Sequence, residues 1–125
     1  MNNVPFELGI PDYEFRLVFG RTKIDYDPIK EESNRKNHGY SLESAVHVLE
    51  KLLLPIGNQN PYVRSDPFIE RGEVRQMHIT VDDSGNVVLM VTTMRAEETV
   101  RVVSFRAAHK KERAQFKHLT GYVKS

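Results

Sequence analysis

The stretch of sequence that decides the fold runs from residue 74 to residue 106 and reads VRQMHITVDDSGNVVLMVTTMRAEETVRVVSFR. Three of its segments are rich in apolar and β-branched side chains, as strands are: residues 74–81, 87–94 and 99–106. The short polar segments DDSGN and RAEE separate them and read as turns. We therefore predict that the three strands are antiparallel neighbours, with the nearly all-apolar segment in a central position.

Two helices are predicted before this stretch. The first opens at Asp27, which can cap free backbone N–H groups, and at Pro28, and it ends at Gly39. The second opens at Ser41 and ends before Pro55. Its apolar residues follow helical spacing along one face: Leu42, Ala45, Val46, Leu49, Leu52 and Leu53.

The remaining segments complete an α+β domain. Residues 13–19 and 23–26 read as short strands that could form a hairpin. Residues 55–72 are rich in Gly, Asn and Pro, and we predict a long loop there. Residues 107–119 read as a basic helix. Two predicted helices precede the three antiparallel strands in the sequence and one follows them. We therefore predict an α+β fold with residues 1–125 as a single domain.

Composition excludes several classes of protein. The chain has no cysteine, so disulfides and thiolate metal sites are excluded. No apolar run reaches the roughly 18–20 residues of a membrane span, and the start lacks a signal-peptide pattern, so we expect a cytoplasmic protein. The net charge of +1 is uneven, since residues 95–125 carry eight Lys or Arg and three Glu. This excess favours a polyanion or an acidic protein as partner, although a solvated basic helix has the same composition.

Short segments in a fixed order carry a resemblance to a known family. They are Tyr26-Asp27-Pro28 with Lys30 and Asn34, His38-Gly39, Ser41-Leu42-Glu43 with Ala45, Glu73 with Arg75, Thr93 with Arg95, RVVSFRAA at 101–108, and Glu112-Arg113. From about residue 24 to residue 118 the chain resembles the BrnT toxins of bacterial type II toxin–antitoxin systems, and residues 1–23 form an N-terminal extension. It departs from the family pattern at Asn37, where a Lys is usual, and at Phe116, where a Tyr is common.

The resemblance implies a RelE-like fold, in which a small antiparallel sheet combines the three-stranded meander with an N-terminal strand or hairpin. Two N-terminal helices and one C-terminal helix accompany the sheet. It further implies a growth-inhibiting endoribonuclease that cleaves RNA, with a BrnA-like antitoxin as protein partner and operator DNA bound only through that antitoxin. No cofactor and no membrane are expected. The alternative is a catalytically inactive toxin-like binding module that acts only through its protein partner, and Asn37 and Phe116 favour it.

RNA is cut without a metal when its own 2′-hydroxyl attacks the adjacent phosphate, which requires proton transfer and stabilisation of the developing charge. His38 is the best proton-transfer candidate, although a histidine at a helix C-terminus also interacts favourably with the helix dipole. Lys36 is near in sequence, but residues two apart on a helix point about 200° apart. Both reach one site only if the helix has ended by His38. We predict that His38, Lys36, Arg75 and Arg106 converge as the catalytic group.

Arginine suits phosphate because a guanidinium donates two parallel hydrogen bonds. Arg75 lies on the predicted buried face of its strand, so it needs an edge position or a carboxylate partner such as Glu73 or Glu112. The family pattern favours Arg106, at the strand–helix junction, as the phosphate-binding residue.

Three more cations are candidates for substrate binding: Arg95, Arg101 and Lys110. Arg101 and Arg106 are five residues apart, so they point to opposite faces of a strand unless a bulge intervenes. Glu112 falls on the apolar stripe of the last helix, which favours an ion pair with a buried arginine over a general base with a raised pKa. No histidine or carboxylate spacing indicates a metal site.

Overall fold

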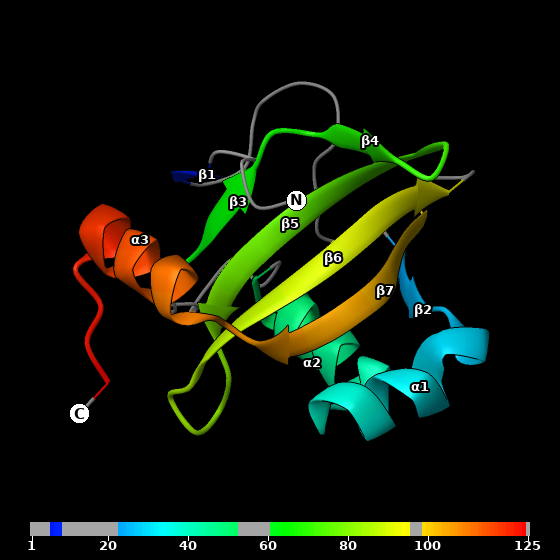
Figure 1. Cartoon of the computed structure of the whole chain (residues 1–125), viewed down its shortest axis with the longest axis horizontal. Coiled ribbons are helices and arrows are strands. Elements are labelled where there is room, and N and C mark those ends of the chain that lie inside the picture. The colour runs from blue at the N-terminus through cyan, green and yellow to red at the C-terminus, as the bar shows by residue number, and fades with distance from the viewer. Residues whose placement is uncertain (1–5, 9–22, 53–60, 96–98, 125) are drawn as a thin grey trace.

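The computed structural model describes residues 6–8, 23–52, 61–95 and 99–124, which form helices and strands around one sheet (Figure 1). The strands are β1 (Phe6–Leu8), β2 (Lys23–Tyr26), β3 (Val63–Ser65), β4 (Phe68–Glu70), β5 (Glu73–Val81), β6 (Val87–Arg95) and β7 (Thr99–Ala107). The helices are α1 (Pro28–His38), α2 (Leu42–Leu52) and α3 (Lys110–Thr120). The predicted α+β class is confirmed. No helix in the described ranges is long and apolar enough to cross a membrane.

The sheet is centred on the predicted meander. β5 pairs antiparallel with β6, and β6 pairs antiparallel with β7, as expected. The strands follow the order β1-β3-β5-β6-β7-β2, and β4 also pairs with β5. The expectation of a purely antiparallel sheet is wrong, because β2 lies parallel to β7. A parallel neighbour requires a long connection, which the helices and the meander supply between β2 and β7. Residues 13–19, the other half of the predicted hairpin, lie outside the described residues.

The predicted loop over residues 55–72 contains two short strands. β3 pairs with β5 through a buried Val63, and β4 forms a tight hairpin with β5 in which Glu70 lies opposite Glu73. Only three residues long each, these strands are too short to show an alternating pattern, and the surrounding Pro and Asn residues favoured a loop.

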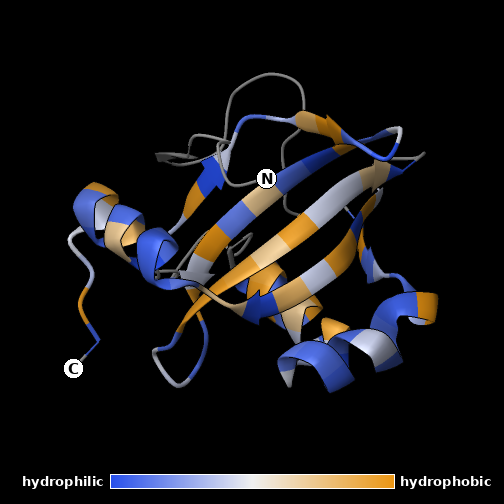
Figure 2. Cartoon of the chain, viewed as in Figure 1, coloured by the Kyte–Doolittle hydropathy of each residue, from blue (hydrophilic) through white to orange (hydrophobic). Residues whose placement is uncertain are grey.

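Both faces of the sheet are covered, and β6 is accordingly apolar along most of its length, whereas β5 alternates polar and apolar side chains (Figure 2). We call the two sides the α2 face and the α3 face after the helices packed on them. The core of the α2 face consists of Leu42, Ala45, Leu49, Val88, Met90, Val100, Val102 and Phe105. The core of the α3 face consists of Val63, Met77, Ile79, Val81, Leu89, Val91, Val103 and Phe116.

Helix α3 begins later than predicted, because β7 continues through Ala107. The side chain of Glu112 then accepts a hydrogen bond of 2.7 Å from the backbone N–H of His109. That bond satisfies one of the free N–H groups at the start of the helix, which explains why the helix starts here and not at Ala107.

A bulge in β7 decides which of its side chains share a face. The pairing of β6 with β7 skips one residue of β7 near the middle of the strands, and an extra residue reverses the alternation of side chains beyond it. Arg101 lies opposite Thr93 and Arg106 lies opposite Leu89. Since Thr93 and Leu89 are four apart on β6, both arginines lie on the α3 face. The bulge named from the sequence as the exception is present, so the two arginines do not point to opposite faces.

Candidate functional site

Helix α1 lies against the edge of the sheet because one buried side chain takes the place of a neighbouring strand. β2 pairs with β7 only as far as Val102. Beyond that point, the amide of Asn34 donates to the carbonyl oxygens of Phe105 and Tyr40, both at 2.8 Å, and accepts from the N–H of Phe105 at 3.1 Å. These bonds satisfy the backbone of the strand edge and hold α1 in place.

A cavity of about 390 Å³ lies between α1 and the sheet, and we call it the α1 cavity. Helix α1 contributes Lys30, Ser33, Asn34, Asn37 and His38. The sheet and the β4–β5 hairpin contribute Glu70, Arg71, Arg75, Val91, Val103 and Ser104. Three of these side chains are cations and one is a carboxylate, apart from the histidine. The cavity therefore favours an anionic ligand.

Arg75 lines this cavity with two carboxylates already bound. Its side chain is 8% exposed, and its guanidinium donates to Glu70 at 2.8 Å and to Glu73 at 2.9 Å. Glu73 also forms an ion pair with Arg95 at 3.3 Å. The hydrogen bond from Arg75, together with the charges of Arg95 and Lys30, holds the pKa of the Glu73 carboxyl below its usual value. The predicted partnership of Arg75 with Glu73 is confirmed.

His38 and Lys36 take different directions from α1. The helix continues through His38 and ends at Gly39, whose φ of 74° is left-handed. Because the helix has not ended before His38, the separation of about 200° applies to the pair. His38 lines the α1 cavity, whereas Lys36 does not. His38 thus shares the α1 cavity with Arg75, and the expected convergence of Lys36 with His38 does not occur.

Arg106 shares a face with Arg75 but lies outside the α1 cavity. Its row of the sheet is four residues from that of Arg75, which is about 13 Å along the strands. Arg106 donates two hydrogen bonds to Glu112, of 2.7 and 2.9 Å, and the two side chains are 14% and 17% exposed. Burial raises the pKa of the Glu112 carboxyl, but Arg106 and the N–H of His109 bring the pKa below its usual value. Glu112 is thus an ion-pair partner, as favoured from the sequence, and not a base with a raised pKa.

The predicted substrate-binding residues are dispersed. Arg101 donates to Asp25 of β2 at 3.0 and 3.2 Å, and Arg95 is paired with Glu73. Lys110 is exposed at the start of α3, at the opposite end of the sheet from α1 (Figure 1). The structure therefore brings together His38 and Arg75 and leaves the other predicted cations outside the cavity.

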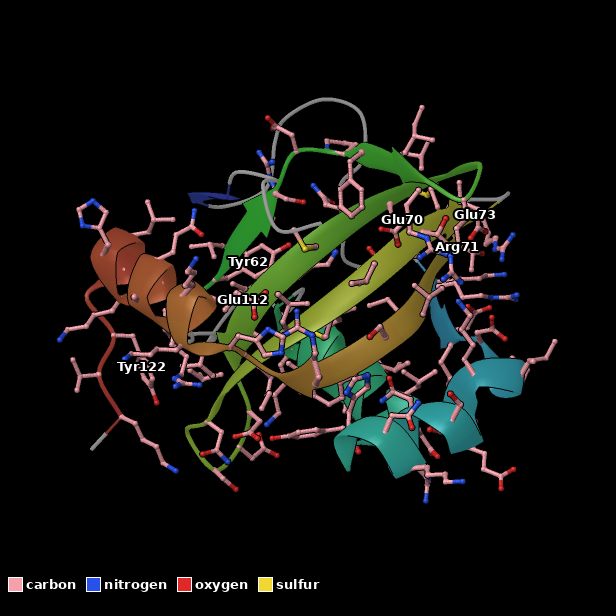
Figure 3. The ribbon with its side chains drawn as sticks, in the orientation of Figure 1. Tyr62, Glu70, Arg71, Glu73, Glu112 and Tyr122 are labelled. Atoms are coloured by element: carbon pink, nitrogen blue, oxygen red, sulfur yellow. The ribbon has the colours of Figure 1, made fainter. Side chains whose placement is uncertain are left out.

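Two cations that line the α1 cavity, Lys30 and Arg71, were assigned no functional role from the sequence. Lys30 belongs to the first turns of α1, where it was read only as part of the family resemblance. Arg71 lies in the turn between β4 and β5, inside the segment predicted as a loop. Figure 3 shows Arg71 beside Glu70 and Glu73 at the end of this hairpin. A Gly directly after Arg71, between two short runs with Phe and Val, is the signal that could have revealed the turn.

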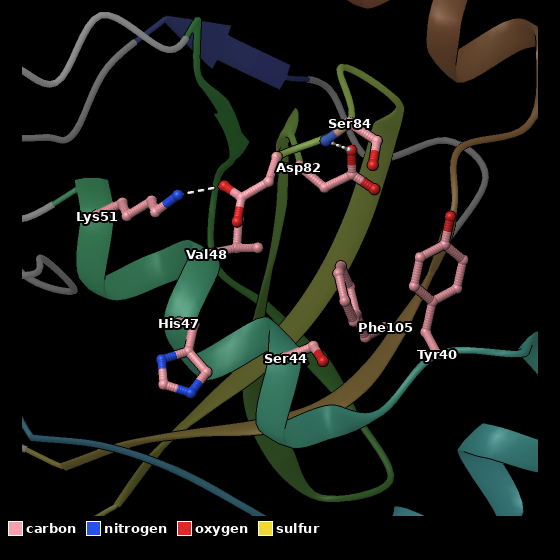
Figure 4. Close-up of a pocket in the computed structure, with 9 residues that line it drawn as sticks. Tyr40, Ser44, His47, Val48, Lys51, Asp82, Ser84 and Phe105 are labelled. Atoms are coloured by element: carbon pink, nitrogen blue, oxygen red, sulfur yellow. Dashed lines mark hydrogen bonds and ion pairs between the residues drawn. The ribbon is translucent and has the colours of Figure 1, made fainter.

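A second cavity, of about 330 Å³, lies on the α2 face, and we call it the α2 cavity (Figure 4). Its lining residues are Tyr40, Ser44, His47, Val48, Lys51, Asp82, Asp83, Ser84 and Phe105. Lys51 forms an ion pair with Asp83 across it. The carboxylate of Asp82 accepts from the backbone N–H groups of Ser84 and Asn86, both at 2.9 Å. No three His, Asp or Glu side chains in the described part of the chain lie close enough together to hold a metal ion.

The fold and the α1 cavity together define a small α+β protein with a cationic, histidine-bearing cavity at the edge of an antiparallel meander. Comparison with protein families identifies the family to which this protein belongs. The chain belongs to the BrnT family of ribonuclease toxins of type II toxin–antitoxin systems, whose family model matches residues 26–112. The match covers α1, α2, the complete meander and the start of α3. No curated protein matches the chain. The protein is therefore a toxin of such a system, with ribonuclease activity as the activity of its family.

Proposed function

We propose that this toxin is a metal-independent endoribonuclease and that the α1 cavity is its active site. The observation that carries the proposal is that His38, from α1, and Arg75, from β5, line one cavity although 36 intervening residues separate them in the chain. A histidine and a fixed positive charge are the two groups that cleavage by the 2′-hydroxyl needs.

In the proposed reaction, the 2′-hydroxyl oxygen of the RNA attacks the adjacent phosphorus, and the bond from phosphorus to the 5′-oxygen breaks. His38 accepts the proton of the 2′-hydroxyl, and water protonates the departing 5′-oxygen. The products are a 2′,3′-cyclic phosphate and a free 5′-hydroxyl. Arg75, held in place by Glu70 and Glu73, presents its positive charge to the phosphate as negative charge develops there, and Arg95 balances the second carboxylate.

We further propose that a BrnA-like antitoxin neutralises the toxin in the cytoplasm and that operator DNA is bound through the antitoxin. Support comes from α3, whose exposed lysines Lys110, Lys111 and Lys117 offer a surface for an acidic segment. Such a contact accelerates association by electrostatic attraction, so the association rate falls as salt is added. Stopped-flow mixing tests this, and an association rate that does not change with salt contradicts it.

The decisive experiment measures cleavage of a fluorescent RNA by the purified toxin in the presence of EDTA. We expect cleavage to continue, and we expect a 2′-deoxy substitution at the scissile position to abolish it. Cleavage that EDTA stops contradicts the metal-independent mechanism. Tight binding of the antitoxin without any cleavage supports instead the binding module without catalysis, in which the paired state of Arg75 and Arg106 is purely structural.

A further inference from the structure

The arginines that the sequence singles out for phosphate binding are all engaged by carboxylates. Arg75 holds Glu70 and Glu73, Arg101 holds Asp25, and Arg106 holds Glu112. The two terminal nitrogens of Arg75 are both used by carboxylates, and only its buried Nε–H lacks a hydrogen-bond partner. A guanidinium in this state has to give up its carboxylates before it can bind a phosphate with two parallel hydrogen bonds. A substrate phosphate is therefore bound more readily by cations that have no carboxylate partner.

Two cations of the α1 cavity satisfy this condition. Arg71 and Lys30 line the cavity, and neither forms a hydrogen bond or an ion pair with any described residue. Arg71 is exposed and Lys30 is half-buried. They come from two separate elements, the β4–β5 hairpin and helix α1, which border the cavity on different sides.

The backbone of Arg71 is a second, independent observation. Arg71 and Gly72 form the two-residue turn of the hairpin, and both have positive φ, 53° and 76°. This turn type favours Asn, Asp or Gly, because a side chain with a Cβ is strained at positive φ. Arg71 is the single non-glycine residue with positive φ among those the structure describes. Strained backbone positions cluster at functional sites, so an arginine in this turn beside the cavity indicates that its guanidinium binds a ligand.

We propose that Arg71, with Lys30 across the cavity, holds a backbone phosphate of the single-stranded RNA substrate. This inference rests on the proposed function, because it assigns the phosphate contact of that same site. Arg71 and Lys30 bind the phosphate directly, while Arg75 stays with its carboxylates and acts as a fixed charge below it. The short hairpin turn fixes the direction in which the Cα–Cβ bond of Arg71 leaves the backbone, which keeps the side chain beside the cavity.

The test uses an oligodeoxynucleotide with the sequence of the RNA substrate, which lacks the 2′-hydroxyl and cannot be cleaved by the proposed reaction. Its binding to the full-length toxin is followed by fluorescence anisotropy over a range of salt concentrations. The variant is Arg71→Asn, because asparagine tolerates the left-handed turn and removes only the cation. Arg71→Gly is a second variant that also fits the turn, and Arg71→Lys restores the charge.

We expect Arg71→Asn to weaken binding roughly tenfold, the effect of losing one charged hydrogen-bonding contact. The slope of log affinity against log salt should decrease in magnitude by about 0.7, the value for one phosphate contact with a single strand. Arg71→Lys should restore the slope and only part of the affinity, because an ammonium lacks the forked geometry. Lys51→Gln removes one exposed cation from the α2 cavity and is the matched control, with wild-type affinity and slope.

Wild-type affinity and salt slope in both Arg71→Asn and Arg71→Gly overturn the inference, even if the wild-type toxin cleaves RNA. If the wild-type toxin fails to cleave RNA yet its DNA binding depends on Arg71, the proposed function falls and the phosphate site stands. Thermal unfolding of each variant accompanies the assay. Arg71→Asn should melt at or above the wild-type temperature because the strained backbone is relieved.

Discussion

The α1 cavity and the α2 cavity are similar in size but differ in how their charges are balanced. Both are lined by a histidine, a lysine and at least one carboxylate. In the α2 cavity, Lys51 is paired with Asp83, and the turn backbone satisfies Asp82. In the α1 cavity, the carboxylates are used to hold a buried arginine, while Lys30 and Arg71 have no such partner among the described residues. Residue types alone therefore do not distinguish the two cavities, whereas the balance of their charges does.

The largest expected effect separates the two histidines. Replacing His38 by alanine should reduce RNA cleavage by about 10²–10⁴, the usual contribution of a general acid or base. Replacing His47, the exposed histidine of the α2 cavity, should leave the rate unchanged. Both rates are measured under single-turnover conditions with EDTA present. Equal activity of the two variants removes His38 from the mechanism.

The second prediction compares the two charge clusters in stability. Arg75→Gln leaves Glu70 without its partner and Glu73 with Arg95 alone, and we expect the free energy of unfolding to fall by about 3 kcal/mol. Lys51→Gln breaks an exposed ion pair and should cost about 1 kcal/mol or less. Urea unfolding measures both free energies. If the two losses are equal, the cluster around Arg75 is not the tight network that the distances describe.

A third comparison concerns two asparagines on the wall of the α1 cavity. Asn34→Ala removes three hydrogen bonds to backbone groups and should cost about 2–3 kcal/mol, at about 1 kcal/mol for each bond. It should also lower cleavage, because α1 and His38 lose their attachment to β7. Asn37→Ala removes one exposed contact of 3.5 Å with Ser33 and should change stability by less than about 0.5 kcal/mol. Unchanged cleavage in Asn34→Ala contradicts the positioning of His38 through α1.

The smallest effect contrasts a buried histidine with the exposed His38. His78 lies between Tyr62 and Thr92, at 2.6 and 2.7 Å, and burial lowers its pKa to about 3. Its ordinary pKa is about 6.5, so between these values the unfolded chain binds one more proton than the folded protein. Stability from the neutral histidine is fully present above pH 6.5 and is lost as the pH falls, by up to about 1.4 kcal/mol per pH unit.

His78→Gln should flatten this dependence by about one proton, as measured by urea unfolding between pH 7 and pH 5. His38→Ala is the control for the loss of a histidine at an exposed position. A wild-type slope in His78→Gln shows that another group is responsible.

Much of the fold could be predicted because local patterns encode it. The alternation and the turns of residues 74–106 predicted the meander, and the caps Asp27, Gly39 and Ser41 predicted the ends of the helices. Each of these signals depends on residues a few positions apart, so neighbouring chain segments are not needed to read them. The pairing of Arg75 with Glu73 was accessible for the same reason, since the two are two residues apart on one strand.

The two three-residue strands and the parallel place of β2 could not be read in this way. β3 and β4 are strands because β5 offers them hydrogen bonds, and β2 lies beside β7 after a connection of more than seventy residues. Residue composition favoured a loop for β3 and β4, and a hairpin for β2. The strands with which these segments pair are distant in the sequence, so no local pattern reveals the pairing.

The sequence by itself determined the three long strands, the three helices and the charge excess, and it singled out His38 and Arg75 among the residues that line the α1 cavity. The tertiary structure alone decided how the arginines are used. The bulge placed Arg101 and Arg106 on one face, the carboxylates occupied both, and the hairpin turn brought Arg71 to the cavity. The physical reason is that a side chain's face follows from strand alternation only while the strand is regular. Its availability for a ligand depends on which opposite charges the fold places beside it.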